Sequence, residues 1–146
     1  MLAYEEREIC VSEPRAAVVL CVDDDPIALM SRRLLLEGLG YEVLVASSGS
    51  SALQIVRGHR VDLVLTDHFM PEMTGAELVA TLKLEDPKIP AVILTGAQEP
   101  PPGSEQADLV LIKGADPQKF LAEIAKFVAE RIAPAETSDD PPNSQQ

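Results

Sequence analysis

Short apolar runs that each end at a polar residue constrain this chain more than any other feature. The runs cover 17–22, 61–66, 91–94 and 109–112, and the polar residues after them are Asp23 with Asp24, Asp67, Thr95 and Lys113. Runs that are apolar almost throughout are typical of parallel strands covered on both faces. In such a sheet these polar residues all emerge at one carboxyl edge, where open α/β folds bind ligands.

The segments between the runs carry helical patterns, which predicts βα units and an α/β fold. Residues 41–45 form a less uniform run and are expected to be an edge strand. Local chemistry predicts where the helices begin, because Asp before Pro and Ser/Thr-x-x-Gln/Glu both satisfy free amides. The predicted starts are Asp25-Pro26, Asp116-Pro117, Ser51 with Gln54, and Thr74 with Glu77.

One connection does not fit a helix. The chain between Thr95 and Leu109 contains three consecutive prolines, 100–102, which lack amide donors and clash with a preceding helical turn. We therefore expect an extended, proline-rich crossover in place of the fourth helix of the fold.

Length and charge bound the organisation of the chain. Its 146 residues suit one domain, predicted over 16–133, between a flexible leader at 1–15 and a disordered acidic and proline-rich tail at 134–146. The net charge of -12 argues against nucleic acid and anionic membrane as partners. No run approaches a membrane span or a signal peptide, which favours a cytoplasmic location. The cysteines, Cys10 and Cys21, form no disulfide framework, and Cys21 is expected to be a small buried hydrophobe.

The polar residues at the predicted edge point to one chemistry. Three carboxylates crowded together repel one another unless a hard cation lies among them, and oxygen ligands suit Mg²⁺, which also binds phosphate. With a hydroxyl from Thr95 and an ammonium from Lys113, the edge is typical of a magnesium-assisted phosphoryl acceptor.

Four stretches together resemble the receiver domain of bacterial response regulators. They are 19–26 (VLCVDDDP), 62–75 (DLVLTDHFMPEMTG), 92–96 (VILTG) and 111–113 (LIK). The resemblance implies a flavodoxin-like doubly wound sheet of five parallel strands in the order 2-1-3-4-5. It also implies a phospho-receiver that takes its phosphoryl group from a histidine kinase or phosphotransfer protein and acts on a further, unidentified protein.

The resemblance assigns a role to each residue of the site. Asp67 would be the phosphoacceptor, and Asp24, Asp67 and the backbone carbonyl of Phe69 would ligate Mg²⁺, with Asp23 acting through bound water. Lys113 would pair with the phosphoryl group.

The residues near Thr95 complete this assignment. Thr95 would donate its hydroxyl to the phosphoryl group and move toward it on activation, and Gly96 would keep the approach open. Two positions that tune hydrolysis in this family are Phe69 and Ala97 here, and neither side chain can orient a water molecule.

The chain departs from the family pattern in its switch. The family places a tyrosine or phenylalanine three residues before the lysine, where this chain has Val110, and a cis-bonded proline after it, where this chain has Gly114. The residues for phosphorylation are all present in the sequence. In the family the aromatic residue swings inward when the threonine moves, and Val110 is not expected to do so because it has no ring.

Two other functions compete with the phospho-receiver. A protein-binding scaffold of the same fold would use the segment 100–102 as its ligand surface, independently of phosphorylation. An enzyme interpretation takes Asp23-x-Asp25 as the nucleophile and acid pair of haloacid-dehalogenase-like phosphohydrolases. It ranks last, because Ile27 and the 117–132 segment do not supply that family's other residues.

No separate output enzyme is expected. Asp25 is expected to cap a helix, and His68 is expected at the surface.

Overall fold

The structure is a computed structural model that describes residues 16–114 and 116–132. The predicted leader at 1–15 and tail at 134–146 lie outside these residues. Five parallel strands form one sheet in the order β3-β2-β4-β5-β6, which in chain order is 2-1-3-4-5 and confirms the predicted topology. The strands are β2 (Val18–Val22), β3 (Glu42–Ala46), β4 (Leu63–Asp67), β5 (Ala91–Thr95) and β6 (Leu109–Ile112).

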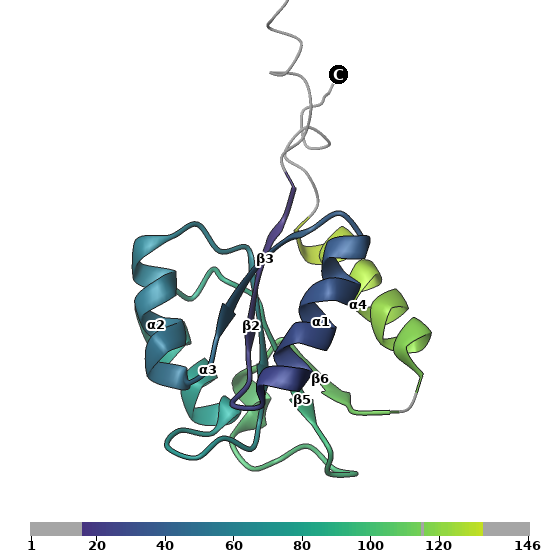
Figure 1. Cartoon of the computed structure of the whole chain (residues 1–146). Coiled ribbons are helices and arrows are strands. Elements are labelled where there is room, and N and C mark those ends of the chain that lie inside the picture. The colour runs from purple at the N-terminus through teal and green to yellow at the C-terminus, as the bar shows by residue number, and fades with distance from the viewer. Residues whose placement is uncertain (1–15, 115, 133–146) are drawn as a thin grey trace, which may run out of the picture.

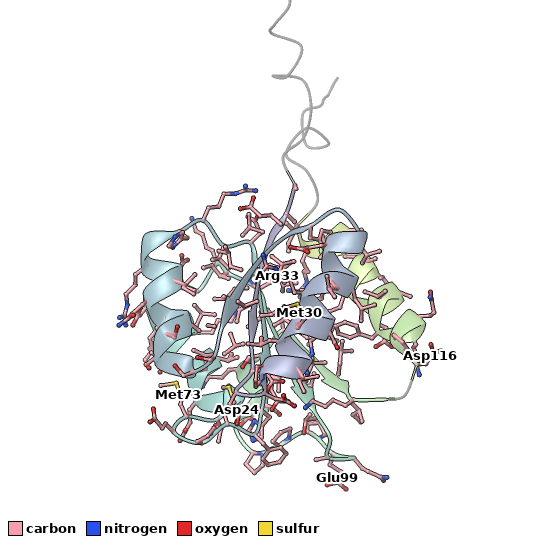
Figure 2. The ribbon with its side chains drawn as sticks, viewed as in Figure 1. Asp24, Met30, Arg33, Met73, Glu99 and Asp116 are labelled. Atoms are coloured by element: carbon pink, nitrogen blue, oxygen red, sulfur yellow. The ribbon has the colours of Figure 1, made fainter. Side chains whose placement is uncertain are left out.

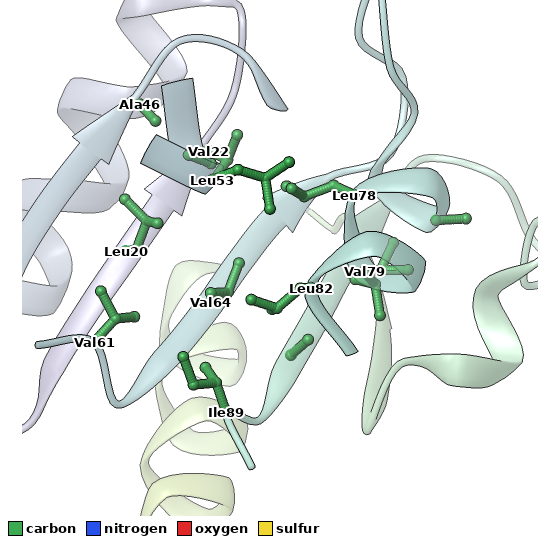
Figure 3. Packing of buried hydrophobic residues seen from close by; sticks show 14 of the residues in the cluster. Leu20, Val22, Ala46, Leu53, Val61, Val64, Leu78, Val79, Leu82 and Ile89 are labelled. Carbon is green, nitrogen blue, oxygen red and sulfur yellow. The ribbon is translucent and has the colours of Figure 1, made fainter. Parts of the chain in front are cut away.

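Helices cover both faces of the sheet (Figure 1). The helices α1 (Pro26–Gly38) and α4 (Pro117–Arg131) lie on one face, and α2 (Gly49–Gly58) and α3 (Gly75–Glu85) lie on the other. Alternate side chains of each strand therefore enter different hydrophobic clusters. Leu20 and Val64 pack with Leu53 of α2 and Leu82 of α3, as Figure 3 shows.

The second cluster lies under α1 and α4 and contains Cys21. Burial raises the pKa of the Cys21 thiol to about 12, so this side chain stays neutral at ordinary pH and packs as the small hydrophobe expected.

Most of the predicted helix starts are confirmed. The Asp25 carboxylate accepts a hydrogen bond from the Ile27 amide (3.0 Å), the Asp116 carboxylate accepts one from the Gln118 amide (2.9 Å), and Thr74 with Glu77 forms a capping box. The capping box predicted at Ser51 with Gln54 is wrong, because α2 begins earlier. Ser48 is the N-cap of α2: its backbone is extended, and its hydroxyl accepts a hydrogen bond from the Ser51 amide (3.1 Å).

The crossover between β5 and β6 contains no α-helix among the described residues, but it is not extended throughout. It closes with one 3₁₀ turn, η2 (Ser104–Gln106), which begins after Gly103 at a φ of 85° that glycine adopts without strain. Pro101 and Ser104 are buried, and the segment packs on α3. The proline segment is therefore a compact loop, and α4 is the helix that the sequence places after β6.

Among the described residues, no helix has the length and apolar character needed to cross a membrane. The cytoplasmic location stays a prediction.

Candidate functional site

Three carboxylates meet at the carboxyl edge of the sheet. Asp23 and Asp24 follow β2, Asp67 ends the neighbouring β4, and each offers a carboxylate oxygen within 4.8 Å of the others. Asp23 and Asp67 are only 2% and 4% exposed, whereas Asp24 is exposed. Figure 2 shows Asp24 at this edge, below the first turn of α1. The edge thus holds two buried anions and one that faces solvent.

A cation from β6 reaches the same place. The Lys113 ammonium forms an ion pair with Oδ1 of Asp67, and the Lys113 amide donates to the Thr95 carbonyl (2.7 Å). The lysine side chain is 42% exposed and that of Asp67 is 6% exposed. A solvent-accessible ammonium therefore pairs with a buried carboxylate. An anionic group that became attached to this carboxylate could also pair with the ammonium.

Thr95 ends β5 beside this pair and is fully buried. Its hydroxyl oxygen accepts a hydrogen bond from the Ala97 amide (3.1 Å), an arrangement that ties the start of the β5–β6 loop to the strand end. Apart from Gly96 and its two chain neighbours, no atom of the described residues lies within 4 Å of the place that a Cβ on Gly96 would take, so the approach at Gly96 is open. Val110 lies back along β6 and packs into the cluster with α2 and α3, away from the carboxylates.

Two aromatic rings follow Asp67. Phe69 is 62% exposed, and its ring meets His68 edge to face, with 4.8 Å between ring centroids. The expectation that His68 lies at the surface is wrong, since only 6% of it is exposed. Its amide donates to the Leu94 carbonyl (2.9 Å), which continues the β4–β5 pairing by one residue and turns the ring inward.

Gly75 closes the loop onto the end of β4. A Cβ at this position would lie 2.5 Å from the Asp67 carbonyl oxygen and 3.0 Å from the His68 Cα. The Gly75 amide also donates to the His68 carbonyl (2.8 Å). Glycine is needed here for this close approach of two backbones, and the contact fixes the peptide that carries the Asp67 side chain.

One residue of the site was missed in the sequence. Arg32 of α1 places Nη1 2.9 Å from Oδ2 of Asp23, and the two side chains are 12% and 3% exposed. The spacing of α1 could have indicated this residue. Arg32 lies three residues after Leu29 and four before Leu36, the two buried residues of the helix, and so lies on the same side of it. A charged residue on the apolar stripe of a helix needs a buried partner of opposite charge.

The donor set fits a divalent cation. Oδ2 of Asp23 and Oδ1 of Asp67 are buried, and neither receives a hydrogen bond from the part of the chain that the structure describes. All the candidate ligand atoms are carboxylate oxygens, which suit Mg²⁺ better than softer metals. The carboxylates therefore have the chemistry to hold Mg²⁺, although Oδ2 of Asp23 and Oδ1 of Asp67 also lie next to the cations of Arg32 and Lys113.

Known proteins resemble the chain in both sequence and fold. Residues 19–125 match the family model described as the response regulator receiver domain. The transcriptional regulatory protein GlrR of Escherichia coli (strain K12) is 41% identical over 81 residues, which cover 56% of this chain but only 18% of that protein.

Two solved structures share the fold over nearly their whole length. The response regulator TrrA of Thermotoga maritima, in complex with Mg(2+)-BeF, is 25% identical, with a TM-score of 0.71, over 75% of this chain and 97% of its own. A response regulator receiver domain protein (CheY-like) of Methanospirillum hungatei JF-1 is 28% identical, with a TM-score of 0.73, over 81% of this chain and 98% of its own.

Proposed function

Because this chain belongs to the response regulator receiver domain family, we propose that it accepts a phosphoryl group on Asp67 from a histidine kinase or phosphotransfer protein. The observation that carries the proposal is the buried Asp67 carboxylate, paired with Lys113 and flanked by two further carboxylates.

In the proposed reaction an Asp67 carboxylate oxygen attacks the phosphorus of a phosphohistidine in line. A P–O bond forms and the P–N bond breaks; its electron pair goes to the imidazole nitrogen, which takes up a proton. Lys113 stays near the transferred group and balances the charge of its oxygens. The Thr95 hydroxyl, at the end of the neighbouring β5, would move toward the transferred group and donate a hydrogen bond to it.

Asp24, Asp67 and the Phe69 carbonyl would hold Mg²⁺, with Asp23 acting through water. The ion would neutralise charge on the carboxylates and on the phosphoryl oxygens. The TrrA complex with Mg(2+)-BeF supports this proposal, because that protein has the same overall fold as this chain.

Incubation with a small phosphodonor, acetyl phosphate, tests the function directly. We expect an intact-mass gain of one phosphoryl group in the presence of Mg²⁺ and little or none in EDTA. A protein that gains no phosphoryl group under either condition would contradict the proposal.

An exposed apolar stripe on α1 supports a protein as the natural donor. Ile27, Met30 and Leu34 recur at helical spacing and are 78%, 55% and 61% exposed. Ile27 lies in the first turn, whose cap Asp25 donates its own amide to Asp23 (3.0 Å), so the stripe begins beside the carboxylates. A donor that brings phosphohistidine to Asp67 must cover this surface.

Replacing Ile27 and Leu34 with serine should slow transfer from a phosphorylated histidine phosphotransfer protein by about tenfold, because an apolar contact surface is lost. Phosphorylation by acetyl phosphate should be unchanged, since a small donor needs no docking surface. Leu84→Ser, at a leucine that is 87% exposed on α3, is the matched control and should transfer normally. Equal slowing with both donors would contradict a docking role.

The side chains of Phe69 and Ala97 predict that the phosphoryl group on Asp67 is long-lived. Hydrolysis needs in-line attack by water, and neither side chain can orient that water. Phe69→Asn and Ala97→Glu should each shorten the half-life of phospho-Asp67 by about threefold or more, measured after removal of the donor. Leu84→Ser should not alter the decay. If polar side chains at both positions leave the decay no faster, the mechanism is wrong.

The two alternatives receive less support. Pro101 is buried, so the segment 100–102 does not offer a continuous proline surface to a partner. Asp25 caps α1 and lies outside the carboxylate cluster, so the Asp23-x-Asp25 pair does not form the acid pair of a phosphohydrolase.

A further inference from the structure

Arg32 brings a second cation to the carboxylate edge, in addition to Lys113. It comes from the middle of α1 and lies on the side of the helix that faces the sheet, beside Leu94, Ile112 and Lys113 in a shared pocket. Few arginines are this well buried without a structural or functional reason, because the guanidinium always carries its charge.

The neighbouring Arg33 shows that burial is specific to position 32. Arg33 pairs with Glu37 across one turn of the same helix (3.1 Å), and those side chains are 45% and 41% exposed. Consecutive helical residues point about 100° apart, so Arg33 faces water while Arg32 faces the carboxylates. The chain thus contains an arginine whose side chain is 12% exposed next to a surface arginine whose side chain is 45% exposed.

Each oxygen of the Asp23 carboxylate has one neighbour, and only one of these contacts is a hydrogen bond. Oδ1 of Asp23 accepts the Asp25 amide (3.0 Å), and Oδ2 lies 2.9 Å from the guanidinium. The short distance brings opposite charges together, but the guanidinium N–H does not point at Oδ2 with hydrogen-bond geometry. Asp23 is therefore neutralised by a nearby charge while its oxygen stays free of a directed bond.

The charges at the edge are almost balanced. Lys113 pairs with Asp67 and Arg32 pairs with Asp23, whereas the exposed Asp24 has no such partner among residues 16–114 and 116–132. A cation that approaches the cluster meets the fixed positive charge of Arg32 next to Asp23, the carboxylate that would act on it through water, and this charge weakens binding. The same charge relieves repulsion between carboxylates when no metal is bound.

We propose that Arg32 is a positioning residue that acts as the built-in counter-ion of Asp23, holding Mg²⁺ affinity down and stabilising the metal-free site. The proposal rests on the proposed function, because it concerns the same metal site. It makes Arg32, which lies outside the sequence motifs of the site, a determinant of how much Mg²⁺ the protein needs.

Calorimetric titration of the full chain with Mg²⁺ tests this inference. Arg32→Gln should bind Mg²⁺ about tenfold more tightly than wild type, because the competing charge is gone. Arg33→Gln, the matched control, should stay within about twofold of wild type, because its charge is screened at the surface. Unchanged or weaker binding by Arg32→Gln would overturn the proposal.

Thermal unfolding separates this role from simple packing. Without metal, Arg32→Gln should unfold at a lower temperature than wild type, since it leaves a buried carboxylate without a counter-ion. Saturating Mg²⁺ should recover most of the difference. A loss of the same size with and without Mg²⁺ would mean that Arg32 only packs, and would also overturn the proposal.

Arg32→Lys provides a second route if Arg32→Gln does not fold. It keeps the charge and changes the packing, so its Mg²⁺ affinity should stay within about threefold of wild type. A tenfold change in Arg32→Lys would exclude the charge as the cause. Phosphorylation of Asp67 in wild type, measured on the same samples, shows separately whether the proposed function itself fails.

Discussion

Replacing Asp67 with asparagine is expected to abolish phosphorylation. The amide has nearly the shape of the carboxylate but cannot form an acyl phosphate, so incorporation from acetyl phosphate should fall by about 1000-fold or more. Intact-mass measurement over time is the readout. The fold should persist, because the change removes a buried charge and leaves the solvent-accessible Lys113 unpaired.

Asp116→Asn is the control for this substitution. Asp116 caps α4, and asparagine caps helices about as well, so this variant should be phosphorylated at the wild-type rate. An Asp67→Asn protein that keeps the wild-type adduct would exclude Asp67 as the acceptor.

Asp24→Ala should remove the dependence on Mg²⁺. Asp24 is the exposed member of the cluster, and losing it removes a proposed metal ligand. Phosphorylation should fall by about 100-fold in Mg²⁺ and then be equally slow in EDTA. Its unfolding temperature should not fall, because the change relieves repulsion with the buried carboxylates of Asp23 and Asp67.

Asp25→Ala should give the opposite result. It loses the cap of α1 and about 1 kcal/mol of stability, but it should keep its response to Mg²⁺. Full Mg²⁺ dependence in Asp24→Ala would contradict the proposed ligand set.

The sheet could be predicted because its strands are buried on both faces. Runs such as 17–22 and 91–94 leave no polar face, and a parallel sheet then places their carboxyl ends together. That rule alone brings Asp23, Asp67 and Lys113 to one edge of the sheet. The resemblance to receiver domains supplies their roles, which remain proposals.

Three of the differences between sequence and structure have a common cause in tertiary contacts. The sequence does not single out Arg32, because nothing in it shows that the buried side of α1 meets a carboxylate. The burial of His68 depends on the extra pairing of its amide with Leu94, and hence on where β5 lies. In the proline segment, the left-handed Gly103 returns the chain onto α3, a contact that local propensity does not reveal.

Borohydride reduction of the phosphorylated protein tests the central claim most directly. The reagent reduces an aspartyl phosphate to homoserine, which peptide mass spectrometry locates in the sequence. We predict homoserine at position 67 alone, in protein treated with acetyl phosphate and Mg²⁺. Homoserine at Asp23 or Asp24, or a phosphoryl mass gain that yields no homoserine, would contradict the assignment of Asp67 as the phosphoacceptor.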